Sequence, residues 1–222
     1  MSENTSEDII NKESSSESHC NLSNYHQACG DFNGHFDPKQ NINIAYQAID
    51  KHLNTALENK VALRWLSKNW LGKHGQQIDF SYRDLAEQTS RFASVLAQLG
   101  FEQGVRVFSL ASRLPLLYIS ALGTLKFGGV FTPLFSAFGP EPIRSRMEIG
   151  EATILITTLN LYRKKVAHWC HELPEFKVVL FIDSPEALNK AGIEPQTLAP
   201  NCFLLTELLA SADPTYPCAQ SH

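Results

Sequence analysis

The sequence predicts an α/β fold with a largely parallel sheet that helices cover on both faces. From residue 81 onward, short apolar segments alternate with longer amphipathic segments, and this order is typical of strand–helix–strand crossover units. Helix start and stop residues, such as Ser81 with Asp84 and later Gly100, separate the two kinds of segment. Of the 222 residues, 43% are hydrophobic, which is enough to bury one sizeable core.

Hydrophobic periodicity and breaker residues predict the elements in order. Ser81 and Asp84 form a helix start, because the hydroxyl can accept a hydrogen bond from an unpaired amide and the carboxylate offsets the positive helix end. The predicted elements are a helix over residues 42–57, a strand over 61–66, an extended stretch at 78–80, a helix over 81–99, a strand over 105–110, a helix over 114–127, a strand over 130–132, a helix over 140–149, a strand over 153–157, a helix over 159–171, a strand over 177–183 and a helix over 185–191.

Composition divides the chain near residue 40. The first 38 residues are rich in Ser, Glu and Asn and contain almost no aliphatic side chains, so they cannot bury enough apolar area to offset the entropy lost on ordering. We therefore expect a disordered polar segment over 1–38, a folded domain over 39–212 and a short tail over 213–222.

Charge and hydropathy exclude several classes of partner. The net charge of −4 gives no basis for sequence-independent nucleic-acid binding. The apolar runs fall far short of the roughly 20 residues that a membrane-spanning helix needs. The first 19 residues lack the basic start and apolar stretch of an export signal. We expect a cytoplasmic chain with neither a nucleic-acid nor a membrane partner.

Cysteine and histidine spacing does not support a metal site. The five cysteines are an odd number without regular spacing, so reduced thiols are expected. His26-x-x-Cys29 and His168-x-x-His171 lack the further ligands that a zinc site requires. We expect no metal.

Basic residues supply the main candidate binding feature. The Gly-rich phosphate loops and the Gly-x-Ser-x-Gly elbow of serine hydrolases are missing. Arg144 and Arg146 lie on one predicted helix, and Arg163-Lys164-Lys165 lies near the predicted start of another. Two interpretations are open: the three cations and the first-turn amides bind a phosphate, or the cations form a solvated helix face.

Several segments resemble the amino-terminal part of the adenylate-forming enzymes, the superfamily of acyl-CoA synthetases, luciferases and peptide-synthetase adenylation domains. These segments are Phe80–Leu85 followed by Ser90-Arg91-Phe92-Ala93 and Leu99-Gly100, then Gly104–Val107 with Leu116-Leu117-Tyr118, and Leu122–Leu134. Two more, Asn43–His52 and Phe135–Glu141 with its following arginines, are similar to AMP-forming acetyl-CoA synthetases. The resemblance extends from about Ile42 to Leu209 and implies an incomplete amino-terminal subdomain of the adenylate-forming fold, so that residues 39–212 would be a partial AMP-dependent synthetase/ligase domain.

The resemblance also implies an activity and a set of site residues. In this family acetate reacts with ATP to give acetyl-AMP and pyrophosphate, and CoA then takes the acetyl group, so CoA and ATP with Mg²⁺ are the implied cofactors. The backbone of Ala137 and Phe138 corresponds to a segment beside the CoA nucleotide. Arg163, with Lys164 and Lys165, falls where arginines contact the CoA 3′-phosphate, although Val166 occupies the position of a second arginine.

The family residues that activate the carboxylate have no counterpart in this sequence. These are the Ser/Thr/Gly-rich loop that ends in Pro-Lys, the adenine-binding aromatic segment, the ribose-binding Asp and the carboxy-terminal domain with its catalytic Lys. We therefore name no catalytic residue and expect no tight cofactor binding and no activity from the chain alone. Three hypotheses follow: the amino-terminal portion of an acetate–CoA ligase, with a separately encoded remainder as partner; a CoA-binding or partner-docking module; and a non-functional truncation product.

Overall fold

The computed structural model describes residues 43–222 apart from 69, 73–74, 195–197 and 221–222. Residues 41–222 form one compact unit. The segment 1–38, which the sequence analysis expects to be disordered, lies outside the described residues, as do His26 and Cys29.

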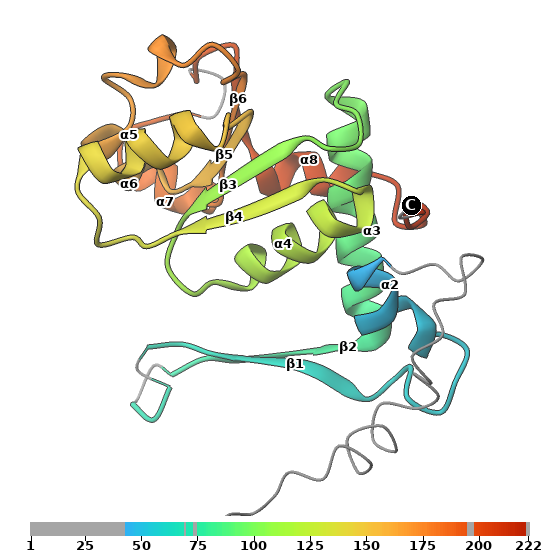
Figure 1. The fold of residues 1–222 in the computed structure, drawn as a ribbon. Helices are drawn as coiled ribbons and strands as arrows, with labels where there is room; N and C mark the ends of the chain where they lie inside the picture. The colour runs from blue at the N-terminus through green and yellow to red at the C-terminus, as the bar shows by residue number, and fades with distance from the viewer. Residues whose placement is uncertain (1–42, 69, 73–74, 195–197, 221–222) are drawn as a thin grey trace, which may run out of the picture. The chain divides into compact units, whose positions relative to one another are not determined.

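A five-stranded parallel sheet lies at the centre of this unit (Figure 1). Its strands, in spatial order, are β4 (Val130–Leu134), β3 (Arg106–Leu110), β5 (Ile154–Thr157), β6 (Val178–Phe181) and β7 (Cys202–Leu204). The chain moves from β3 to one neighbour, β4, and then crosses back to the other neighbour, β5. The strand order therefore reverses at β3 and β5, which makes their carboxyl ends a topological switch point.

Helices cover both faces of the sheet, which confirms the predicted fold class (Figure 1). One face packs against α3 (Tyr82–Gln98), α4 (Pro115–Phe127) and α8 (Leu205–Ser211), and the other against α5 (Pro140–Ile149), α6 (Leu159–Lys165) and α7 (Pro185–Lys190). Successive strand residues point to opposite faces. Ile154 and Ile156 accordingly join the core of the first face, and Leu155 joins the core of the second.

A separate antiparallel ladder precedes the main sheet. It pairs β1 (Val61–Leu66) with β2 (Gln77–Ser81), the two extended stretches predicted from sequence. Leu63 and Phe80 pack against the core around α3 and α4, while the indole Nε1 of Trp65 donates a hydrogen bond of 2.8 Å to the Arg113 carbonyl. The hairpin is therefore attached to the segment that follows β3.

The predicted helix over 42–57 is wrong in its extent. The structure has α2 (Ile44–Ala48) and the 3₁₀ turn η2 (Asp50–His52), followed by turns. Asn54 adopts a φ of 59°, and the Thr55 hydroxyl donates to the His52 carbonyl. Asn and Thr side chains offer the backbone local alternatives to a helix, which the apolar spacing does not reveal.

The predicted helix over 159–171 is also too long. α6 ends at Lys165, and only a 3₁₀ turn, η3 (Cys170–Glu172), follows. Trp169 Nε1 donates to the Lys165 carbonyl at 2.7 Å, which satisfies a carbonyl that the helix would otherwise use. After residue 191 the sequence pattern predicts no element, whereas the structure has β7 and α8.

Lys126 is the most buried charged side chain described, with 1% of its side chain exposed. Its ammonium donates to Asp50 Oδ1 at 2.7 Å, to Ser90 Oγ at 3.0 Å and to the Ala86 carbonyl at 3.3 Å. An ammonium has three donors, and all three are used. This contact joins η2, α3 and α4.

The segment after residue 212, which the sequence analysis sets apart as a tail, packs on the same helices. The carbonyl of Tyr216 accepts from Ser90 Oγ, and the Ala219 amide donates to the Lys126 carbonyl at 2.8 Å. Burial raises the pKa of the nearby Cys218 thiol to about 11, so this thiol is uncharged at neutral pH. The described end of the chain is therefore part of the packed unit.

The first residues of α3 form the capping box that the sequence predicts. Ser81 Oγ accepts from the Asp84 amide at 3.1 Å, and Asp84 Oδ2 accepts from the Ser81 amide at 2.8 Å. The hydrogen bonds from Ser81 hold the pKa of the Asp84 carboxyl below its usual value. The charged carboxylate therefore stabilises the folded state.

The Lys126→Met variant should lose about 3 kcal/mol of unfolding free energy, because removing one partner leaves the Asp50 carboxylate buried without its ammonium. Urea unfolding followed by circular dichroism measures this loss. Lys190→Met, at an exposed lysine at the end of α7, is the matched control and should stay within about 0.5 kcal/mol of wild type. A Lys126→Met variant as stable as this control would contradict the account.

The capping box predicts a pH dependence. Asp84→Ala should lower the unfolding free energy by about 1 kcal/mol at neutral pH, since the amide and the hydroxyl of Ser81 both lose the carboxylate that accepts from them. Because the folded-state pKa of Asp84 is lowered, this contribution is complete above the unfolded pKa of about 3.9 and is lost as the pH falls through the folded value. Unfolding measured across acidic pH should show the two proteins converging. Glu87→Ala, at an exposed position on the same helix, should show no such convergence.

Candidate functional site

The loop between β4 and α5 lies at the carboxyl end of the sheet, where open α/β sheets bind ligands. It contains Phe135, Ala137 and Phe138, and it ends at Gly139, the N-cap of α5. Pro140 then occupies the first turn of the helix, where its fixed φ favours helical geometry. Both site residues that the resemblance implies in this segment, Ala137 and Phe138, therefore lie on this loop.

Lys165 fixes the shape of the loop. Its ammonium donates hydrogen bonds of 2.7 Å to the carbonyls of Ser136 and Phe138, one on each side of Ala137. Lys165 is half-buried at the end of α6. Two of its three donors thus hold the main chain of the loop, and one donor remains.

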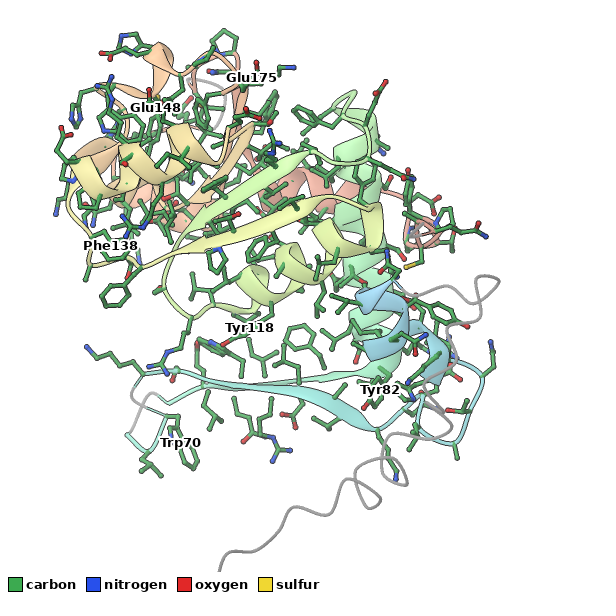
Figure 2. All side chains as sticks on the ribbon, viewed as in Figure 1. Trp70, Tyr82, Tyr118, Phe138, Glu148 and Glu175 are labelled. Carbon is green, nitrogen blue, oxygen red and sulfur yellow. The ribbon has the colours of Figure 1, made fainter. Side chains whose placement is uncertain are left out.

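Aromatic and cationic side chains surround Phe138, which Figure 2 shows on this loop. The ring of Phe135 meets that of Phe138 edge to face, with centroids 5.5 Å apart. The guanidinium carbon of Arg146 lies 4.5 Å from the Phe138 centroid, within the range of a cation–π contact. Phe135 remains 64% exposed and so offers an apolar surface beside the loop.

The structure corrects the position of the basic run. Arg163, Lys164 and Lys165 lie in the last turn of α6, not near its start. A helix end presents carbonyls rather than free amides, so the first-turn amides cannot join these cations in holding a phosphate. Arg163 and Lys164 are exposed, and their side chains have no hydrogen bond or ion pair within the described residues. They are available to an anion in solution.

The other side chains near the loop have structural contacts. Arg144 pairs with Glu172, with a closest N···O distance of 2.6 Å. On α6 itself, burial, together with the Cys170 thiol 3.6 Å from the phenol oxygen, raises the pKa of Tyr162. This phenol therefore stays neutral and contributes no charge to the site.

Sequence reasoning found the residue types of this region but not the contact that organises it. Lys165 is separated from its two acceptors by 29 and 27 positions, and backbone carbonyls carry no sequence signal. Arg146 was noted only as a member of a basic cluster, and its contact with Phe138 follows from the register of α5 on the loop.

The described residues contain neither a cluster of metal ligands nor a helix that could cross a membrane. No group of three or more His, Cys, Asp or Glu side chains among the described residues is arranged to hold a metal ion. Within the same part of the chain, no helix combines the length and the apolar character that crossing a membrane requires.

Relatives of known function share sequence with this chain. The acetyl-coenzyme A synthetase of Bacillus subtilis is 33% identical over 135 residues, which are 59% of this chain and 23% of that protein. The acetyl-coenzyme A synthetase of Desulfatibacillum aliphaticivorans is 30% identical over 166 residues, 73% of this chain and 23% of the relative. A 3-hydroxypropionyl-coenzyme A synthetase of Sulfurisphaera tokodaii is 28% identical over 123 residues, which cover 55% of this chain and 18% of that protein. The chain spans less than a quarter of the length of these relatives.

Solved structures show the same fold. An acyl-CoA synthetase from Brucella canis superposes with a TM-score of 0.67 at 25% identity, covering 84% of this chain and 30% of that one. The anthranilate CoA ligase AuaEII, at 16% identity, gives a TM-score of 0.64 over 80% of this chain and 30% of its own and supports the fold alone. The model of the AMP-binding enzyme family matches residues 51–216. That match covers most of the sequence, and the chain, which is similar to part of the acyl-CoA synthetases, therefore belongs to the AMP-binding enzyme family.

Proposed function

We propose that the chain is the amino-terminal portion of an acetate–CoA ligase, the enzyme that converts acetate, ATP and CoA to acetyl-CoA, AMP and pyrophosphate. The family membership supports the class of reaction. Acetate in particular is supported by the segments Asn43–His52 and Phe135–Glu141 and by the names of the relatives. The 3-hydroxypropionyl enzyme among the relatives marks the nearest competing acyl group.

The contact of Lys165 with the two loop carbonyls is the observation that carries the proposal. It holds Ala137 in a fixed position next to the exposed end of α6. In the proposed site, the Ala137-Phe138 backbone lies along the nucleotide of CoA, and Arg163 with Lys164 contacts the 3′-phosphate. Lys165 acts mainly as a positioning residue, since most of its donors already bind the loop.

The residues present fit CoA better than they fit ATP. Two exposed cations that have no partner among the described residues, together with an exposed aromatic ring, suit a phosphorylated nucleotide. No Gly-rich loop follows any of the described strands in a pattern that could cradle a triphosphate. We propose that the 222-residue chain binds CoA weakly and does not form acetyl-AMP on its own.

A CoA-binding or docking module without catalysis is the second candidate. The same loop and cations favour it, because they require no ATP chemistry. The two candidates differ in the expected effect of adding a separately encoded remainder of the enzyme to the chain. Such an addition would restore ligase activity only if the chain is one part of a ligase.

CoA should bind the wild-type chain more tightly than dephospho-CoA, because only CoA carries the 3′-phosphate. Exposed ion pairs contribute about 0.2–1 kcal/mol each, so Arg163→Ala should weaken CoA binding about two- to fivefold. Arg163→Ala with Lys164→Ala should remove the difference between the two ligands. Isothermal titration at low ionic strength measures these affinities, and added salt should reduce them.

Lys190→Ala serves as the matched control, since it removes an exposed helical lysine on α7. It should leave the preference for CoA intact. Equal binding of CoA and dephospho-CoA by the wild type would refute the assignment of the 3′-phosphate contact.

A further inference from the structure

A groove of about 610 Å³ opens between the β1–β2 hairpin and the segment that joins β3 to α4. This volume lies within the range of roughly 300–1,000 Å³ that is typical of small-molecule sites. We name it the hairpin groove. Its lining includes Trp65, Lys68 and Trp70 from the hairpin side and Ser112, Arg113 and Tyr118 from the other side. It shares no lining residue with the β4–α5 loop.

The groove lies at a favourable place in the fold. Ser112 and Arg113 follow the carboxyl end of β3, one of the two strands at the topological switch point. Ligands of open α/β sheets bind outside the carboxyl ends of strands at such points. The position is thus independent support for a binding site.

Aromatic rings form much of its wall. The hydrogen bond from Trp65 to the Arg113 carbonyl fixes the indole and ties the two sides of the groove together. Tyr118 on α4 is 37% exposed and Trp70 is 47% exposed. Figure 2 shows Tyr118 between α4 and the hairpin, with Trp70 beside the hairpin turn. Exposed rings on a preformed wall can stack against a planar ligand.

The charges of the lining are all positive. Arg64, Lys68 and Arg113 line the groove, and no Asp or Glu does, although the whole chain carries a net charge of −4. Asp79 binds the Arg64 guanidinium at 2.7 and 2.8 Å. The side chains of Lys68 and Arg113 form no hydrogen bond or ion pair in the part of the chain that the structure describes. The groove therefore complements an anion.

We propose that the hairpin groove binds a nucleoside phosphate. The base stacks against Trp65 and Tyr118, and Lys68 with Arg113 binds the phosphate through charge-assisted hydrogen bonds. A ring joined to an anion satisfies both features of the lining at once, whereas a simple anion would leave the rings exposed. This site does not depend on the proposed CoA contact, which uses other residues.

Titration of AMP and of GMP into the full chain tests the proposal, with tryptophan fluorescence as the first readout, because Trp65 and Trp70 line the groove while Trp169 is buried. Both nucleotides should bind, since stacking does not discriminate strongly between bases. Adenosine and inorganic phosphate, each with half of the required chemistry, should bind at least about tenfold more weakly.

Variants separate the groove from other anion sites. Lys68→Gln with Arg113→Gln should weaken AMP binding at least about tenfold, and Tyr118→Ala should weaken it while Tyr118→Phe retains it. Lys190→Gln, at an exposed lysine outside both proposed sites, should leave it unchanged. Thermal melts should show the Gln variants as stable as wild type, because they remove no contact within the described residues.

Two results would overturn the proposal. One is the absence of saturable AMP binding by the wild-type chain. The other is an AMP affinity that the paired Lys68→Gln and Arg113→Gln substitutions leave unchanged, because the nucleotide would then bind outside the hairpin groove. If Arg163→Ala abolished binding instead, the nucleotide would bind at the α6 cations.

Discussion

The buried ammonium of Lys126 is the constraint on which the packing of the helices on one face depends. A charge so deeply buried is costly unless its donors are satisfied, and its partners come from η2 and α3 while Lys126 itself belongs to α4. The adjacent carbonyls are used as well: Asn43 donates to the Leu125 carbonyl at 2.7 Å and to that of Ala219 at 3.2 Å. The carboxyl end of α4 is thus in contact with both the first and the last described parts of the chain.

This arrangement sets the positions of both proposed sites. α4 runs from Pro115, directly after the hairpin-groove segment, to Phe127, directly before β4. The position of α4 therefore determines the position of β4, the strand that leads into the β4–α5 loop. β4 is an edge of the described sheet, and it contains Pro133, which has no amide to donate. Proline is typical of edge strands and discourages pairing with a further strand.

Local signals in the sequence were sufficient for most of the fold. Ser81 with Asp84 starts α3, and Gly128 ends α4 with a φ of 84°, a conformation that glycine adopts without strain. The errors occurred where side chains compete for the backbone. After the first helical region the Thr55 hydroxyl donates to the His52 carbonyl, and at the end of α6 the Trp169 indole donates to the Lys165 carbonyl. β7 and α8 were missed because a strand of three residues and a helix of seven give little periodicity. In the candidate site, the residue types were predictable. The hydrogen bonds of Lys165 to the loop were not, because its partners are backbone atoms far away in sequence.

We propose that this chain holds a CoA-facing part of an acyl-CoA synthetase without the groups that activate the carboxylate. Those groups act by positioning and by electrostatic stabilisation of the phosphates, so we expect no first half-reaction from this chain alone. The most direct test is acetate-dependent exchange of labelled pyrophosphate into ATP by the purified chain. The account predicts exchange no greater than that of a control without protein. Acetate-dependent exchange above this control, proportional to the amount of chain added, would contradict it.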